Sequence, residues 1–174
     1  PSNTVNDINH LLAAEGAVAI RANDKYIEFD FGNYNVISRL IEGEYPDYNQ
    51  VVPETSEETI KVDKQELISV LQRTSIFTDQ DSLAVTLDIS ATELGISKSL
   101  NSLGDINDKI AIEYNGEEAL QIGFNPAYLL DVLKTINGKE VTIELNGADK
   151  PGVIRIGEEY TYVVLPMKIV KEEI

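Results

Sequence analysis

Three segments of the chain place apolar residues at intervals of three and four, the spacing that gathers them on one face of a helix. These segments span residues 4–14, 63–77 and 125–137. Their apolar stripes consist of Val5, Ile8, Leu11 and Leu12, then Leu67, Val70, Leu71 and Thr74, and finally Leu129, Leu130, Leu133 and Ile136. We therefore predict three amphipathic helices, each with one face directed at a core.

Two of the predicted helices carry start or stop signals. Asp63 and Glu66 have the spacing of a capping box at the start of the second helix. In the third, Asn125 can cap the first turn, Pro126 occupies the first helical position, and Gly138 follows the end. These signals place the helix boundaries within a few residues.

Alternating apolar and polar residues follow each predicted helix, the pattern of half-buried strands. The alternating positions are Val18 and Ile20, Ile27, Phe29 and Phe31, and segment 36–41; then Val85, Leu87 and Ile89, Leu94 and Ile96, and Ile110, Ile112 and Tyr114; then Val141, Ile143 and Leu145, Ile154 and Ile156, and segment 160–165. The helices begin roughly 60 residues apart, so one helix and about three strands form an internal repeat. This order predicts an α+β fold whose largely antiparallel sheets carry helices on one face.

The repeats are distributed unevenly along the chain. Residues 55–174 hold two repeats and residues 1–54 hold one, and the polar stretch PETSEET (53–59) between them is typical of a linker. Two repeats can bury each other's helix stripes, so we expect a mate for the first repeat to precede residue 1. The alternatives are a single domain of three repeats and a short protein that is complete as it stands.

Composition narrows the class of protein. Hydrophobic residues make up 43% of the chain, which is typical of a globular protein. The chain has no cysteine, which excludes disulfides and thiolate chemistry and fits a reducing cytoplasm. Since no apolar run reaches the length of a membrane span, we predict no membrane association.

The net charge of −16 disfavours contact with nucleic acid at long range. The charge is not evenly spread, because the helical segments 2–14, 63–77 and 125–139 carry −1, 0 and +1. A surface built of these helices would be neutral to weakly basic and could face a polyanion without tight phosphate contacts. Amphipathic helices often carry balanced charge, however, so an ordinary surface without a polyanion partner is an equal alternative.

Candidate catalytic groups are sparse. His10 is the only histidine and lies in a predicted helix, and the chain has no nucleophile elbow, phosphate loop or dinucleotide fingerprint. The paired acidic residues fall in turns or at the C-terminus and lack the spacing of a calcium loop. We predict no catalytic residue, no metal site and no cofactor, with a hydrolase based on paired carboxylates as a remote alternative.

The last strand ends in VVLPMKIV, an unusually apolar sequence for a chain terminus. Pro166 cannot donate to a ladder, so pairing should stop there and leave Met167 and Ile169 near a sheet edge. Methionine adapts well to varied apolar partners. The alternative from pattern alone is an ordinary C-terminal strand whose last residues pack inward.

Three stretches show a resemblance to a known family, and the order of the predicted elements agrees with that family across essentially the whole chain. SRLIEGEYPDYNQVVP (38–53), IGFNPAYLLDVLK (122–134) and YVVLPMKI (162–169) resemble, in order and spacing, segments of the β subunit of bacterial DNA polymerase III, the sliding clamp. The resemblance implies the DNA-clamp fold, with residues 1–54 as the second half of the middle domain and residues 55–174 as the third domain. It also implies three similar domains per subunit and a ring of two subunits with helices lining the hole.

The function implied by the resemblance is that of a processivity factor. Such a subunit encircles double-stranded DNA without reading sequence, and it tethers the DNA polymerase III alpha subunit, the clamp-loader delta subunit and other proteins with a clamp-binding motif. It is a non-catalytic subunit of a DNA-directed DNA polymerase holoenzyme in the cytoplasm. We expect a homodimer in the complete protein and no ring from this fragment; the alternative is a stand-alone peptide-binding or structural module without a DNA role.

The resemblance also implies site residues. The positions that match the partner-peptide pocket are Pro46, Gln50, Val51, Ser82, Asn125, Tyr128, Val163, Val164, Leu165, Pro166, Met167, Lys168 and Ile169. Gln50 stands where some clamps carry arginine and Ser82 where some carry an aromatic ring, so the peptide preference can differ. The matched subunit contact is Ile76 and Phe77, with a plain core role as the alternative. Placement on helices makes Lys64, Arg73, Lys134 and Lys139 candidates to face DNA.

Overall fold

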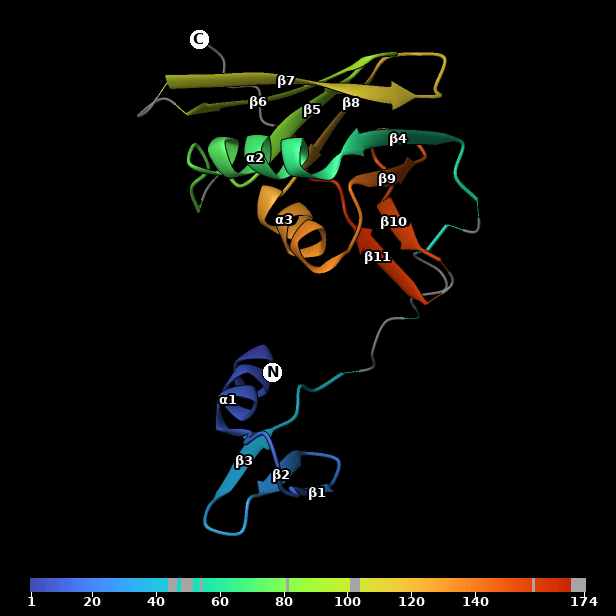
Figure 1. The fold of residues 1–174 in the computed structure, drawn as a ribbon. Helices are drawn as coiled ribbons and strands as arrows, with labels where there is room; N and C mark the ends of the chain where they lie inside the picture. The colour runs from blue at the N-terminus through green and yellow to red at the C-terminus, as the bar shows by residue number, and fades with distance from the viewer. Residues whose placement is uncertain are drawn as a thin grey trace. The chain divides into compact units, whose positions relative to one another are not determined.

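A computed structural model describes residues 1–43, 47, 52–53, 55–80, 82–100, 104–157 and 159–169. The chain separates into two compact units, residues 1–46 and 47–174, which we call unit 1 and unit 2. Figure 1 shows the elements of both units. The antiparallel sheets and helices agree with the predicted α+β class. Within the described residues, no helix combines the length and apolar character needed to cross a bilayer.

Unit 1 consists of one helix and one small antiparallel sheet. Its elements are α1 (Ser2–Leu11), β1 (Ala19–Ala22), β2 (Tyr26–Asp30) and β3 (Asn35–Arg39), with the strands in the order β1-β2-β3. A 2.7 Å hydrogen bond between the hydroxyls of Thr4 and Ser38 joins the helix to the last strand. Helix α1 starts and ends earlier than the predicted span 4–14, and no side chain caps its start.

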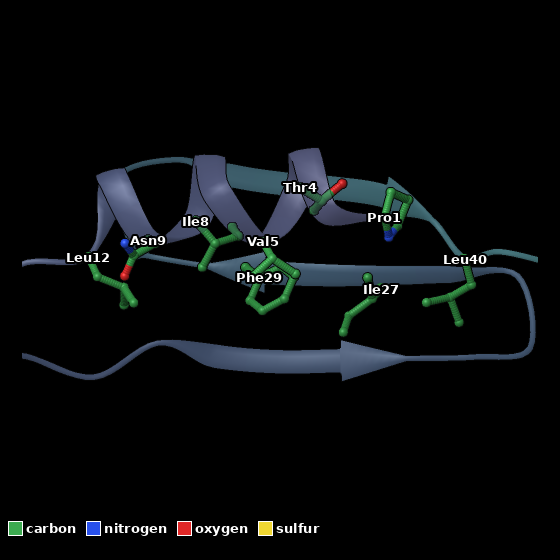
Figure 2. A pocket seen from close by; sticks show the side chains of 9 residues that line it. All are labelled: Pro1, Thr4, Val5, Ile8, Asn9, Leu12, Ile27, Phe29 and Leu40. Carbon is green, nitrogen blue, oxygen red and sulfur yellow. The ribbon is translucent and has the colours of Figure 1, made fainter. Parts of the chain in front are cut away.

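The apolar stripe of α1 is only partly covered. Ile8 is buried, whereas the side chain of Val5 is 67% exposed. Figure 2 shows Val5 and Ile8 of α1 together with Ile27 and Phe29 of β2. These residues line a groove of about 430 Å³ along the helix. The single repeat of unit 1 therefore leaves much of its helix stripe exposed.

Unit 2 contains two helices and one curved antiparallel sheet. Its elements in chain order are β4 (Glu58–Asp63), α2 (Lys64–Ser75), β5 (Val85–Ile89), β6 (Glu93–Leu100), β7 (Gly104–Tyr114), β8 (Leu120–Phe124), α3 (Pro126–Thr135), β9 (Glu140–Leu145), β10 (Gly152–Ile156) and β11 (Tyr160–Val164). The sheet order is β11-β10-β9-β4-β7-β6-β5-β8. Helices α2 and α3 contact each other and lie on the same face of this sheet (Figure 1).

The repeat in unit 2 is one strand longer than predicted. Each half runs strand, helix and three strands, and the first strand of each half pairs with the other half: β4 with β9, and β8 with β5. The predicted linker 53–59 is wrong in its last residues, because Glu58 and Thr59 already belong to β4. Strand β8 was not predicted, although its apolar residues Leu120, Ile122 and Phe124 do alternate with Gln121 and Gly123.

The helix starts of unit 2 follow the predicted capping. The Asp63 carboxylate accepts hydrogen bonds from the backbone N–H of Gln65 and Glu66 at 2.9 and 3.0 Å. Asn125 caps α3 by accepting from the N–H of Ala127 at 3.0 Å. The predicted apolar stripes of both helices are buried. These stripes and the inner face of the sheet form one core.

Candidate partner-binding site

The candidate site lies where β11 ends and the chain continues as residues 165–169, which we call the C-terminal tail. Strand β11 pairs with β10 as far as Val164 and lies at one edge of the sheet. The tail then reaches β8, the strand at the other edge, where the N–H of Met167 donates to the carbonyl of Gly123 at 2.8 Å. Pairing ends before Pro166, in agreement with the expectation from its missing N–H.

The tail presents apolar side chains to solvent. Leu165 is 62% exposed and Met167 is 37% exposed, whereas Val164 directly before them is buried. Ile169 is half-buried. The alternative of a last strand whose residues all pack inward is therefore wrong for Leu165. Exposed apolar residues grouped in this way are typical of a contact surface for a partner.

The first turn of α3 is tied to β11 next to the tail. The Tyr162 hydroxyl donates to the backbone carbonyl of Tyr128 at 3.0 Å. Burial, followed by the nearby Asp131 carboxylate, raises the pKa of Tyr162 above its ordinary value, so the hydroxyl keeps its proton to a higher pH than an ordinary tyrosine does. The ring of Tyr128 is itself 53% exposed. Tyr162 thereby fixes the backbone that carries this exposed ring.

Asn125 performs the capping task predicted for it at a position that is also predicted to contact a partner. Its side chain is buried, and its carbonyl oxygen is engaged as the cap of α3. The amide nitrogen of Asn125 is the group that is not engaged in the cap, and it can contact a partner as a donor. The Lys168 side chain in the tail is exposed and can also only donate.

Ser82 lies in the segment that precedes β5. Val85 pairs with Phe124, so the residues before β5 lie beside the start of α3. The Ser82 hydroxyl accepts a short hydrogen bond from the ammonium of Lys98 on β6. The predicted pocket residues Pro46, Gln50 and Val51 lie outside the described residues.

The predicted subunit contact is at the end of α2. Ile76 is 69% exposed, and Phe77 is half-buried. The core alternative is therefore wrong for Ile76. An isolated exposed isoleucine would be unremarkable, but here a second apolar residue adjoins it.

The four predicted DNA-facing cations fall into two classes. The Lys64 ammonium donates to the carbonyl of Ile136 at 2.8 Å, directly after the end of α3, and the Arg73 guanidinium pairs with Asp108 of β7 at 2.8 Å. Lys134 and Lys139 are exposed and form no side-chain ion pair within the part of the chain that the structure describes. The charge of Arg73 is therefore paired, whereas the neutral carbonyl only positions the Lys64 ammonium, whose charge has no ion-pair partner among the described residues.

Outside this site, residues suited to catalysis or metal binding are sparse among the described residues. His10 is exposed on α1. Among the described residues, no group of three or more histidine or acidic side chains is arranged to hold a metal ion.

Sequence reasoning missed three residues that shape the site. They are Gly123, which accepts the hydrogen bond of the tail, Tyr162, which holds the start of α3, and Lys98, which bonds Ser82. A glycine inside an apolar strand signals close approach of another backbone, and this signal was available for Gly123. The partners of Tyr162 and Lys98 depend on strand register, which no local pattern reveals.

Comparisons with known proteins identify the same protein family in both parts of the chain. The family model for the DNA polymerase III beta subunit, central domain, matches residues 1–47, and the model for the C-terminal domain of the same subunit matches residues 49–168. The beta sliding clamp of Synechocystis sp. is 29% identical over 177 residues, covering 98% of this chain and 45% of that protein. The beta sliding clamp of Treponema pallidum is 30% identical over 174 residues, covering 97% and 47%.

Solved structures give the same result. A crystal structure of a sliding clamp from Bartonella birtlesii bound to griselimycin has a TM-score of 0.80 and 31% identity, covering 97% of this chain and 46% of that chain. The DNA polymerase III subunit beta from Pseudomonas aeruginosa has a TM-score of 0.78 and 28% identity, covering 97% and 47%. The chain thus spans about half the length of the relatives that it matches.

Proposed function

This chain belongs to the family of the DNA polymerase III beta subunit, and we propose that it is part of a sliding clamp that encircles double-stranded DNA and tethers partner proteins to it. The observation that carries the proposal is the match of two consecutive family domains, central then C-terminal, over residues 1–47 and 49–168. These matches support assigning residues 1–54 to the second half of the middle domain and residues 55–174 to the third domain.

The proposed mechanism is tethering without bond chemistry. A ring that slides on the duplex holds a docked polymerase near the primer end, which replaces a bimolecular encounter by a high effective concentration. The role is non-catalytic and belongs to the cytoplasm, where the alpha subunit and the clamp-loader delta subunit are the proposed partners. Ile76 and Phe77 are the proposed contact to a second subunit in the ring.

We assign the docking of partner peptides to the C-terminal tail and the start of α3. Leu165, Met167 and Tyr128 offer exposed apolar surface to the hydrophobic anchors of a linear peptide. The Asn125 amide and the Lys168 ammonium supply donors, so they suit peptide carbonyls or carboxylates. The resemblance assigns Val163, Val164, Pro166, Ile169 and Ser82 to the same pocket. It also assigns Pro46, Gln50 and Val51, which lie outside the described residues.

The DNA-facing role is assigned to Lys134 and Lys139 in the first place. Lys64 is positioned by the Ile136 carbonyl and Arg73 is paired with Asp108, so their contribution to phosphate contacts is smaller. A small set of candidate cations favours a loose, sliding contact, because tight binding to DNA requires many phosphate contacts.

The docking proposal is tested by titrating the 174-residue chain against a fluorescein-labelled peptide that carries the clamp-binding motif of a polymerase III alpha subunit. Fluorescence anisotropy should report binding by the native chain. The double variant Leu165→Ala, Met167→Ala should bind roughly 30-fold more weakly. Loss of each apolar contact costs at least about 1 kcal/mol, so the two together cost about 2 kcal/mol.

Ile37→Ala serves as the matched control, because Ile37 is also an exposed apolar residue but lies on β3 of unit 1. This variant should bind the peptide like the native chain. Equal affinity of the native chain and the double variant would contradict the assignment of the tail as the docking surface.

A further inference from the structure

Gly123 occupies an unusual place in β8. Its neighbours Ile122 and Phe124 both point into the core. Side chains alternate along a strand, so position 123 faces the opposite side of the sheet. Gly123 is nevertheless buried, which means that something covers this outer side.

The cover is the C-terminal tail. The N–H of Met167 donates to the Gly123 carbonyl at 2.8 Å. A methyl group placed on Gly123 would lie 2.5 Å from the carbonyl oxygen of Met167 and 3.0 Å from Cγ1 of Ile169. The first distance is a severe clash with backbone, which cannot be relieved by rotating a side chain.

The requirement for glycine at this position is therefore steric. Gly123 is not among the glycines with positive φ, so any residue could adopt its backbone conformation. Gly95 on β6, which β5 separates from β8, shows the contrast, because a methyl group there would lie 3.5 Å from the nearest atom, an ordinary contact. Gly123 is thus required only for as long as the tail lies against it.

We propose that Gly123 is a positioning residue that docks the tail on β8 and thereby holds Leu165 and Met167 in place for partners. A tail fixed before binding loses less conformational freedom when a peptide arrives, so its affinity is higher. The docking follows from the contacts above, and its effect on affinity rests on the proposed docking of partner peptides.

The experiment compares the native chain with Gly123→Ala and with the control Gly95→Ala. Amide hydrogen exchange should show the Met167 N–H protected in the native chain and in Gly95→Ala. In Gly123→Ala the exchange should be at least roughly tenfold faster, equivalent to about 1.4 kcal/mol, because the hydrogen bond of the Met167 N–H is lost. The amides of β5 and β8 should remain protected, which separates release of the tail from unfolding.

Peptide affinity is measured on the same three proteins by anisotropy. Gly123→Ala should bind roughly tenfold more weakly, and Gly95→Ala should be unchanged. A Met167 amide that stays protected in Gly123→Ala would overturn the docking role. Release of the tail with unaltered affinity would overturn its effect on binding. If the native chain does not bind the peptide, the proposed function fails, while the exchange data still decide the docking role.

A second variant covers the case in which Gly123→Ala also loosens the sheet. Met167→Pro removes the N–H that donates to Gly123 and leaves β8 unaltered. Both changes release the same tail. The double variant should therefore be no less stable to urea than the less stable of the two single variants. Additive losses would show that Gly123 acts through other contacts and would overturn the proposal.

Discussion

Helix α1 in unit 1 and helices α2 and α3 in unit 2 all carry an apolar stripe at helical spacing, but they bury it differently. In α2, Leu67 and Leu71 are fully buried, and in α3 the same holds for Leu133. In α1, Ile8 is buried and Val5 remains mostly exposed. Equal patterns in the sequence therefore lead to unequal burial.

The difference arises from the number of repeats that pack together. In unit 2, α2 contacts α3, and the two halves exchange their first strands through the pairs β4–β9 and β8–β5. In unit 1, a single repeat offers its helix only three strands, and an apolar groove stays along α1. One repeat can form the secondary structure, but two are needed to close a core around the helices.

The largest expected effect comes from truncating the buried stripe. Leu133→Ala should lower the free energy of unfolding of unit 2 by about 2–5 kcal/mol, because it removes a fully buried side chain and leaves a cavity. Val5→Ala in the exposed stripe should change the stability by less than about 0.5 kcal/mol. Urea unfolding followed by circular dichroism measures both. Similar losses for the two variants would show that α1 is buried to the same degree.

A smaller effect is expected at the helix starts. Asp63→Ala should cost roughly 1 kcal/mol, because two backbone N–H groups of α2 lose their acceptor. Helix α1 has no side-chain cap, so the control Ser2→Ala should be close to neutral. Urea unfolding again gives the comparison, and Asp63→Asn, which retains an acceptor, should recover most of the loss. A neutral Asp63→Ala would mean that tertiary packing alone holds the start of α2.

The smallest effect concerns the alkaline range. Burial, followed by the Glu58 carboxylate, raises the pKa of Tyr114 to about 12 from its ordinary value of 10.0. The folded state therefore holds this proton more tightly than the unfolded state, so the associated stability is complete below pH 10 and is lost as the pH rises toward 12. Tyr114→Phe should have a flatter stability profile over this range in urea titrations. An unchanged slope would contradict the assignment to Tyr114.

Much of the secondary structure could be predicted from local patterns. The capping residues Asp63 and Asn125, the buried stripes of α2 and α3 and the alternating strands all lie where the sequence places them. The prediction failed at β4, which was partly taken for a linker, and at β8, which was missed although Leu120, Ile122 and Phe124 alternate. Each of these strands pairs with a strand of the other half of the unit, and β4 also pairs with β7 of its own half.

The candidate site was predictable in its residues and not in its arrangement. The apolar tail around Met167 stood out in the sequence, and Pro166 correctly marked the end of pairing. The docking of the tail on Gly123 and the bond from Tyr162 to the start of α3 join residues that lie 44 and 34 positions apart. The committed donors of Lys64 and Arg73 likewise depend on contacts with α3 and β7.

The sequence by itself determined the repeat, the helix caps, the apolar stripes and the apolar end of the chain, because these depend on neighbours a few residues apart. Tertiary structure decided which stripes are buried, which cations remain free and where the tail lies. These outcomes depend on the meeting of distant strands and on the space left between them. At Gly123 that space has no room for a methyl group.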